Sequence, residues 1–313
     1  MHIKRIIFFY FTFFIISCGG NYSGNEGEIK ESLTFQTKSF MAVGDTGSII
    51  TSDDGIEWES ITSGTAQNLN GIAFGDAIGI VGDGGIIISS TSYTSWRKHH
   101  PYYLIYRSIV YGSGKYVIVS YLGDIISTSD WYSWTKASCD TSYYAFYDVA
   151  HDNVSNYFLA VGENGIIFKT EDMSSCAQRT SGTSNHLNGV IFLNNQYIIV
   201  GNSGTILVSS DGGNTWSSKT SGTSQDLMAI LYENNTYVVV GRSGTILISS
   251  DGETWLSKTS GISQDLYGIA YGLNTFVAVG MEGVIITSKD TNTWIKRRSG
   301  IHFSINDVIY KTD

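Results

Sequence analysis

Asp211 lies in the stretch SSDGGNTW (209–216), where serine and glycine flank a carboxylate and a tryptophan follows. A carboxylate in such a loop could serve as a general acid, ligate a metal ion, or accept backbone amide hydrogen bonds in a tight turn. Related stretches place Asp251 in SSDGETW and Asp54 in TSDDGIEW. The other acidic positions of a calcium loop and its closing glutamate are missing, so we interpret these aspartates as turn formers.

Other residue types that could do chemistry are scattered along the chain. His99 and His100 are adjacent, whereas His151, His186 and His302 are isolated from one another. This spacing does not match a metal-binding motif, and the chain has no G-x-S-x-G nucleophile turn and no phosphate-binding loop. The sequence therefore predicts no metal, no cofactor and no enzymatic activity.

One unit is repeated seven times along the chain. The pattern V-G-x-x-G-x-I, with serine for the first glycine in the third copy, begins at Val43, Val81, Val119, Val161, Val200, Val240 and Val279. Six copies carry a tryptophan soon after this pattern, among them Trp58 and Trp255, fourteen residues after the first glycine position, and Trp216, fifteen residues after it because of an extra glycine; the fourth copy has Cys176 instead. A regular period of about 40 residues is typical of propellers and other repeat architectures.

Each unit contains four short apolar segments separated by turn residues. In the sixth unit these are LMAILY, TYVVVG, TILISS and TWLSKT, covering 227–232, 236–241, 245–250 and 254–259. Segments of this length between Gly, Asn, Asp and Ser favour an antiparallel meander, which must stack on its neighbours to bury both faces. We predict an all-β fold, a seven-bladed β-propeller of four-stranded antiparallel blades.

A terminal strand is expected to close the ring. Ile305–Tyr310 (INDVIY) matches the first strand of a blade, but no second strand follows it. Residues 31–35 also fall in first-strand register, which leaves eight candidates for seven places. We favour the C-terminal segment because its apolar residues Ile305, Val308 and Tyr310 fit the pattern better.

The run S-x-D-x-G-x-T-W resembles an Asp-box, the bacterial neuraminidase repeat. The longer pattern VGxxGTIL-SSDGxTW resembles the seven-bladed propellers of the photosystem II assembly factor-like group, over roughly residues 29–311. The resemblance implies that the Asp-box is the turn between the third and fourth strands of a blade. It is specific for fold rather than function, and the chain has no match for the arginine-rich patch of those relatives.

The resemblance also raises a glycosidase of sialidase type as the alternative function. Such enzymes place three arginines around a carboxylate, together with a Tyr–Glu pair and an acidic residue. The arginines outside the signal segment, Arg97, Arg107, Arg179, Arg242, Arg297 and Arg298, occupy different positions in the repeat. We therefore expect a non-catalytic binding or assembly module for a protein or glycan partner.

The N-terminus has the pattern of a bacterial lipoprotein signal peptide. Two basic residues precede an apolar run of eleven residues, 6–16, which is too short to span a bilayer. Ser17-Cys18 stands at the position of a lipobox cleavage site, so we expect Cys18 to be acylated. The sequence predicts a signal peptide (1–17), a polar tether (18–28), a propeller (29–313), and localisation in the bacterial cell envelope, as an outer-membrane or surface lipoprotein.

Charge and cysteine content limit the partners and the cross-links. The formal net charge of −9 and the absence of a basic stripe argue against nucleic acid. We expect a monomer that contacts the membrane only through the lipid on Cys18. An exported chain permits a disulfide between Cys139 and Cys176, and the sequence leaves this pairing open.

Two blade-to-blade segments differ strongly from the rest. Most read TSGTSQDL or similar, but 98–107 is KHHPYYLIYR and 139–148 is CDTSYYAFYD. Both are expected on the same propeller face as the loop that carries Tyr121. Aromatic side chains with polar tips suit protein partners or sugars, although they could instead fill gaps left by irregular loops. The candidate patch comprises His99, His100, Tyr102, Tyr103, Tyr121, Tyr143 and Tyr144.

Overall fold

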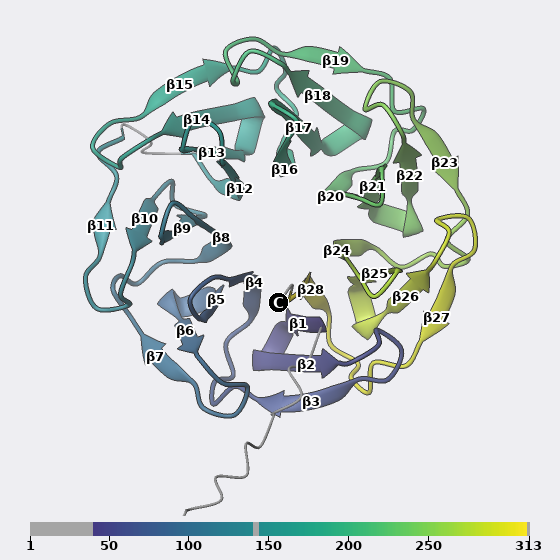
Figure 1. Ribbon diagram of the computed structural model, residues 1–313, viewed down its shortest axis with the longest axis horizontal. Helices are drawn as coiled ribbons and strands as arrows, with labels where there is room; N and C mark the ends of the chain where they lie inside the picture. Colours follow the sequence, from purple (N-terminus) through teal and green to yellow (C-terminus); the bar gives the residue numbers. More distant parts are fainter. Residues whose placement is uncertain (1–39, 140–143, 312–313) are drawn as a thin grey trace, which may run out of the picture. The chain divides into compact units, whose positions relative to one another are not determined.

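A computed structural model describes residues 40–139 and 144–311, and its strands form a closed ring of seven blades (Figure 1). Each blade is a four-stranded antiparallel sheet, as the sequence predicts. We number the blades in chain order, so that blade 1 contains β1. Apart from six three-residue 3-10 turns the described part is strand and loop, and none of it forms a helix that is long and apolar enough to cross a membrane.

The strands occupy equivalent places in every blade, from the channel outward. The innermost strands are β28 (Ile305–Tyr310), β4 (Leu69–Phe74), β8 (Tyr106–Gly112), β12 (Phe146–Asp152), β16 (Leu187–Leu193), β20 (Leu227–Glu233) and β24 (Leu266–Gly272). The second strands are β1 (Phe40–Gly44), β5 (Ile78–Gly82), β9 (Lys115–Ser120), β13 (Tyr157–Gly162), β17 (Gln196–Gly201), β21 (Thr236–Gly241) and β25 (Thr275–Gly280).

The two outer places are filled in the same order. The third strands are β2 (Ser48–Ser52), β6 (Ile87–Ser90), β10 (Ile125–Thr128), β14 (Ile166–Thr170), β18 (Thr205–Ser209), β22 (Ile246–Ser249) and β26 (Ile285–Ser288). The outermost strands are β3 (Glu59–Thr62), β7 (Arg97–His99), β11 (Thr135–Lys136), β15 (Ala177–Thr180), β19 (Ser217–Lys219), β23 (Leu256–Lys258) and β27 (Ile295–Arg297).

The C-terminal strand closes the ring, as predicted. β28 pairs antiparallel with β1, with Phe40 opposite Tyr310 and Ala42 opposite Val308. The two ends of the propeller are therefore held in one sheet, and the inner edge of β1 is paired like that of the other second strands. The competing segment, 31–35, lies outside the described residues, as do the predicted signal peptide and tether.

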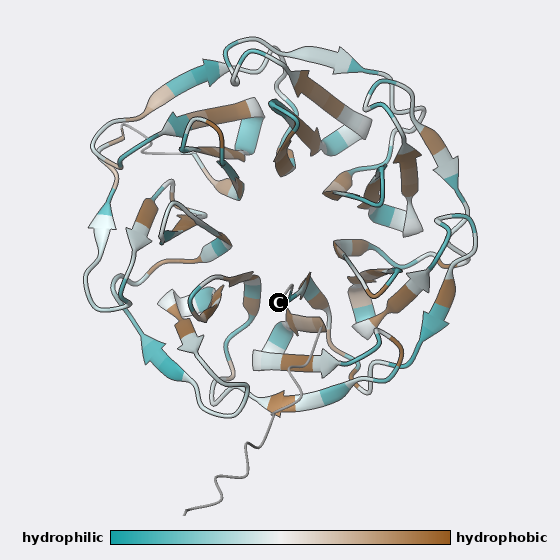
Figure 2. Cartoon of the chain, viewed as in Figure 1, coloured by the Kyte–Doolittle hydropathy of each residue, from teal (hydrophilic) through white to brown (hydrophobic). Residues whose placement is uncertain are grey.

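The hydrophobic core lies between the blades rather than within one central cluster. Second and third strands are buried on both faces because each sheet is covered by a neighbour on either side (Figure 2). The outermost strands are short and mostly exposed, which explains their polar composition. Seven clusters of buried residues each join two adjacent blades, for example Ile198 and Val200 of blade 5 with Tyr237 and Val239 of blade 6.

A tryptophan contributes to six of these seven layers. Trp255 of blade 6 is buried in the layer with blade 5 and lies beside Tyr237, with ring centroids 6.2 Å apart. Trp216 of blade 5 and Trp58 of blade 1 occupy the same place in their own layers. A large aromatic side chain at each interface explains why tryptophan recurs with the repeat.

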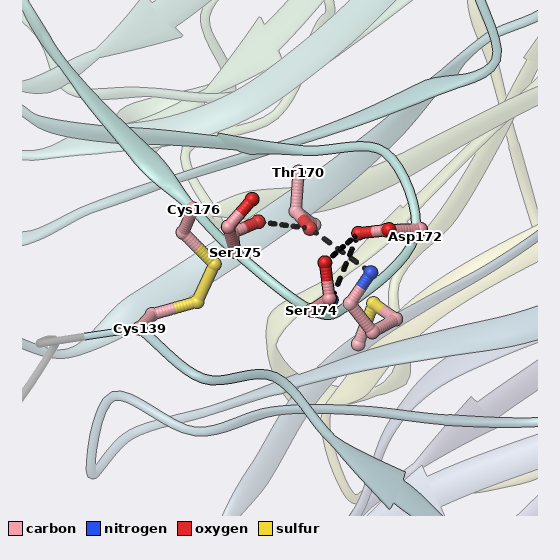
Figure 3. The surroundings of a disulfide bond; sticks show 7 residues. Cys139, Thr170, Asp172, Ser174, Ser175 and Cys176 are labelled. Carbon is pink, nitrogen blue, oxygen red and sulfur yellow. Dashed lines mark hydrogen bonds between the residues drawn. A yellow bond between two sulfur atoms is a disulfide. The ribbon is translucent and has the colours of Figure 1, made fainter.

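The layer between blades 3 and 4 lacks a tryptophan of blade 4 and carries a disulfide instead (Figure 3). Cys139 follows the outermost strand of blade 3, and Cys176 stands where the other blades have tryptophan. Their Cα atoms are 5.1 Å apart, and Met173 is buried in the same layer. The pairing that the sequence left open thus joins two blades at the junction that lacks the recurring tryptophan.

Candidate functional site

The propeller has two faces with different loops. One face, here called the link face, carries the blade-to-blade segments and the turns between second and third strands. Six of these turns are 3-10 turns: η1 (Asp45–Gly47), η2 (Asp83–Gly85), η3 (Glu163–Gly165), η4 (Asn202–Gly204), η5 (Arg242–Gly244) and η6 (Met281–Gly283). Backbone hydrogen bonds tie the turns to the links, as in Asp83 N–H to Asn68 O at 2.9 Å. The link face is therefore a stiff platform.

The opposite face, here called the aspartate-turn face, carries the turns between third and fourth strands. Asp211 Oδ1 accepts hydrogen bonds from the amides of Asn214 and Thr215, both at 3.0 Å, and Oδ2 accepts from the Thr215 hydroxyl at 2.6 Å. These hydrogen bonds, led by that of the Thr215 side chain, lower the pKa of Asp211. A carboxylate with these acceptor roles filled and a lowered pKa is a poor general acid.

Asp54 and Asp251 stand in the same arrangement. Asp251 Oδ1 accepts from the amides of Glu253 and Thr254 at 2.8 and 2.9 Å, and Asp54 Oδ1 accepts from Ile56 and Glu57 at 2.7 and 3.0 Å. Each of these carboxylates closes its own turn, which is the local preference of aspartate in tight turns.

Three tyrosines of the candidate patch are exposed on the link face. Tyr103 is 89% exposed, Tyr121 43% and Tyr102 38%, and His100 is also exposed. Leu122, which the sequence analysis did not single out, is 60% exposed beside Tyr121. We call Tyr102, Tyr103, Tyr121 and Leu122 the aromatic patch.

The other candidates are placed differently. His99 is buried, its Nε2 lies 2.8 Å from Ser89 Oγ, and its ring stacks on Trp131 at 5.6 Å. It fills the layer between blades 2 and 3, and burial lowers the pKa of His99. Tyr144 is half-buried and packs against the layer of blades 3 and 4, while Tyr143 lies outside the described residues.

Hydrogen bonds hold the aromatic patch to the scaffold. The Tyr106 hydroxyl donates to the Tyr102 carbonyl at 3.2 Å, and the Tyr121 amide donates to the Ile105 carbonyl at 2.8 Å. The Gly85 amide of η2 donates to Leu104 O at 2.6 Å. The link between blades 2 and 3 is thus fixed to the turns of both blades, and its backbone loses little further freedom on binding.

Blade 3 differs from its neighbours at this point. Its second and third strands are joined without a 3-10 turn, and Ser120 instead organises the loop. Ser120 Oγ accepts from the amides of Leu122 and Asp124 at 3.3 and 3.0 Å. Tyr121 and Leu122 consequently project where the other blades have a glycine-bounded turn.

The channel opens on the link face into a cavity of about 530 Å³, here called the mouth cavity. Every innermost strand has a β-bulge at its link-face end, seen as a skipped residue in the pairing. Bulges re-aim side chains, and here each bulged residue lines the cavity: Asn70, Arg107, Tyr147, Asn188, Met228, Tyr267 and Asn306.

Three asparagines of this ring latch neighbouring blades together. Asn188 Nδ2 donates to Asn202 Oδ1 at 2.7 Å and to the Leu227 carbonyl of the next blade at 2.9 Å. Asn70 likewise donates to Asp83 and to the Tyr106 carbonyl of the next blade. Asn306 donates to Asp45 and to the Leu69 carbonyl of the next blade. The latches explain why asparagine recurs at this position.

The ring departs from asparagine in blades 3 and 4, next to the aromatic patch. The Arg107 guanidinium lies 5.2 Å from the Tyr121 ring centroid, and Tyr147 contacts the His186 ring with centroids 5.8 Å apart. Burial is the main cause that raises the pKa of Tyr147. Arg107, Tyr147 and His186 thus form an arc of potential donors along one side of the mouth cavity.

Two carboxylates lie one residue beyond the bulges. Asp148 Oδ2 accepts from the Val190 amide of blade 5 at 2.8 Å, and Asp148 Oδ1 accepts from the Ser108 hydroxyl of blade 3 at 2.7 Å. Asp307 Oδ2 accepts from the Ile72 amide of blade 2 at 3.1 Å. Burial raises the pKa of Asp148 to about 6 and that of Asp307 to about 7. Both carboxylates tie blades together.

Sequence reasoning missed this ring, although the aligned repeats contain its signal. The residue after the first buried position of each innermost strand is the bulged one, and reading that position down the seven copies gives N, R, Y, N, M, Y and N. Period-two alternation alone does not reveal it, because a bulge shifts the register.

The described part of the chain holds no metal-ligand cluster, and in it the Ser113 hydroxyl lies beside a histidine. No group of three or more His, Cys, Asp or Glu residues lies close enough to hold a metal ion there. Ser113 Oγ lies 2.9 Å from His151 Nε2, but this hydroxyl donates to Asn156 Oδ1 at 3.0 Å. The proton is therefore directed away from the histidine that would have to accept it.

Comparison with solved structures shows the same fold. The structure described as "YCF48 bound to D1 peptide" has a TM-score of 0.66 and 20% identity, over 80% of this chain and 88% of that one. YCF48 from Cyanidioschyzon merolae has a TM-score of 0.64 and 16% identity, over 81% and 92%.

The WD40 propeller domain of Doa1 has a TM-score of 0.61 and 14% identity, over 83% of this chain and 88% of that one. At these identities the likeness establishes the propeller fold alone. No family model and no curated protein matches the chain.

Proposed function

We propose that this chain is a non-catalytic binding or assembly module that recognises a protein partner on its link face. The aromatic patch carries this proposal. Tyr102 and Tyr103 are exposed on the link between blades 2 and 3, and Tyr121 and Leu122 are exposed on the adjacent loop of blade 3, and hydrogen bonds fix both segments in place. Aromatic side chains on rigid loops are the usual anchors of protein interfaces. A similar propeller, YCF48, has been solved with a D1 peptide bound, which favours a protein over a glycan.

The proposal includes anchoring to the bacterial envelope through a lipid on Cys18. β1 runs from Phe40, paired with Ser52 beside an aspartate turn, toward η1 on the link face. Phe40, the first described residue, therefore lies at the aspartate-turn face, opposite the aromatic patch.

Replacing Cys18 by serine tests the anchor. Acylation needs the cysteine thiol, and stable membrane attachment needs the acyl chains. In cells that make the full chain, we expect the Cys18→Ser protein to leave the membrane fraction and to lose incorporation of labelled fatty acid. Unchanged labelling and fractionation would contradict this part of the proposal.

The binding surface is tested by cross-linking capture from cells that produce the protein. We expect Tyr102→Ala combined with Tyr103→Ala to reduce the yield of the cross-linked partner about tenfold, because the patch loses its large aromatic contacts. Tyr132→Ala is the matched control, since Tyr132 is 72% exposed but belongs to an aspartate turn on the other face. Turnover of fluorogenic sialosides or β-glucans by the purified protein would overturn the non-catalytic assignment.

A further inference from the structure

Arg107 lines the mouth cavity and has no ion-pair partner in the described part of the chain. Its side chain forms no hydrogen bond and no ion pair with the described residues, and its Nε is buried without an acceptor. The guanidinium only lies against the face of the Tyr121 ring. Buried donors in native proteins usually have a partner, and those without one call for an explanation.

Comparison with the other arginines sharpens this observation. Arg179 also has a buried Nε without an acceptor, but it lies on the outermost strand of blade 4, and its Nη1 donates to Gln178 O at 3.3 Å. Arg242, the second arginine at the mouth cavity, pairs with Asp226 at 3.3 Å. Arg107 therefore differs from both by combining an unused guanidinium with a place at the cavity.

The groups beside Arg107 are donors as well. His186 Nδ1 accepts a hydrogen bond from the Asn164 amide at 3.0 Å, so the neutral ring carries its proton on Nε2. The Tyr147 hydroxyl, on the neighbouring bulge, makes no hydrogen bond within the described residues. Guanidinium, phenol and imidazole N–H thus supply donors along one side of the cavity.

The carboxylates of the cavity already have donors. Asp83 accepts from Asn68 and Asn70 at 3.1 and 2.8 Å, and Asp45 accepts from Asn306 at 3.0 Å. Neither of them lies within ion-pairing distance of Arg107. Among residues 40–139 and 144–311, the positive charge of Arg107 therefore has no anionic partner and can take one from a bound molecule.

We propose that the mouth cavity binds a carboxylate group of the partner peptide, with Arg107 as its anchoring cation. This inference rests on the proposed function. Arginine suits the task because its planar guanidinium pairs with a carboxylate through two parallel hydrogen bonds. The Tyr121 ring that lies beside Arg107 also belongs to the aromatic patch, so a peptide crossing the patch brings its carboxylate to the cavity.

The side-chain Nε–Hε resonance of Arg107 tests the proposal directly. We would titrate the labelled protein with N-acetyl-Ala-Tyr-Ala as free acid and as C-terminal amide, with N-acetyl-Ala-Asp-Tyr amide, and with glucuronic acid. The resonance is assigned by its absence in the Arg107→Gln variant. We expect a peptide carboxylate to shift it, and the uncharged amide to leave it unmoved.

The choice of probe molecules also distinguishes a terminal carboxylate from a side-chain carboxylate. A shift with the free acid assigns a chain terminus, and a shift with the aspartyl peptide assigns an acidic side chain. Arg107→Gln should weaken the binding of the peptide that shifts the resonance by about tenfold or more. Because the variant lacks this resonance, its binding is followed on neighbouring backbone resonances. The matched control Arg179→Gln should leave the affinity unchanged.

Four results would overturn the inference: no shift with any peptide acid, equal shifts with acid and amide, a response to glucuronic acid alone, or unchanged affinity in Arg107→Gln. Partner capture separates this failure from failure of the proposed function. If capture survives Arg107→Gln but is lost in the Tyr102→Ala/Tyr103→Ala variant, the result supports the link face as the binding surface and contradicts the carboxylate site. If capture survives both changes, the proposed function falls.

Discussion

Aspartate takes opposite roles in this molecule according to its surroundings. Hydrogen bonds in an exposed turn, the largest from Thr215, lower the pKa of Asp211, whereas burial near the channel raises the pKa of Asp307 to about 7. The turn carboxylate stabilises its loop in the ionised form, and the channel carboxylate is held in a place that disfavours the charge. Residue type alone therefore does not assign a role.

The channel carboxylates predict a specific dependence of stability on pH. Because the pKa of Asp148 and of Asp307 is raised in the folded state, their contribution to stability is full below about pH 4 and is lost as the pH rises through 6 to 7. Because one pKa unit corresponds to about 1.4 kcal/mol, the loss is roughly 3–4 kcal/mol for each residue. Replacing both by asparagine should remove it and leave a pH-independent cost from changed hydrogen bonds.

The measurement is the free energy of unfolding of the wild type minus that of the double variant, from pH 4 to pH 8. Burial lowers the pKa of His99 and of His151, which acts in the opposite direction but cancels in this difference. We expect the difference to fall across the range. A difference that is constant with pH would show that the two carboxylates ionise as they do in the unfolded chain.

At the scale of elements, the junction of blades 3 and 4 shows how one missing side chain is replaced. The other junctions contain a tryptophan from the later blade, while this one contains Met173 and the Cys139–Cys176 disulfide. The cross-link joins residues 37 apart in the sequence, so it restricts the unfolded chain substantially.

Cys176→Ser should therefore destabilise the protein by about 2–4 kcal/mol. Denaturant unfolding of the oxidised wild type and of the variant measures this cost. Cys139→Ser removes the same disulfide and should lower the free energy of unfolding by the same amount. Reduction of the wild type should reproduce this decrease. Equal stability of all these forms would contradict a structural role for the disulfide.

Some elements could be predicted from the sequence and others could not. The strand TYVVVG was predicted over 236–241 and lies there, because apolar strands bounded by turn residues leave little choice. The seven blades and the closure by Ile305–Tyr310 follow from the period of the repeat. The bulges were missed because an extra residue shifts the period-two apolar pattern of one strand without marking its own position.

The candidate patch shows the same limit. Tyr102, Tyr103 and Tyr121 are exposed, as a departure from the repeat suggests, but His99 is enclosed between two blades by Trp131. Its neighbours in sequence are exposed, and only the packing of the next blade decides its burial. Leu122 and Arg107 were not singled out because each is an ordinary residue until the fold places it beside Tyr121.

At the scale of the whole molecule, the two faces divide the work. The aspartate-turn face consists of turns that aspartates close in six of the seven blades, while the link face combines the mouth cavity with the aromatic patch. A ring whose blades are latched by asparagines can present the link face without rearranging. We therefore expect the partner to bind the link face and not the aspartate-turn face.

The most direct test is the yield of cross-linked partner from cells that produce the wild type, the Tyr102→Ala/Tyr103→Ala variant or the Tyr132→Ala control at equal levels. Thermal unfolding of each purified protein verifies that the rings are intact. We predict that the yield falls about tenfold only in the link-face variant. An undiminished yield from that variant, or an equal loss in the control, would contradict the account.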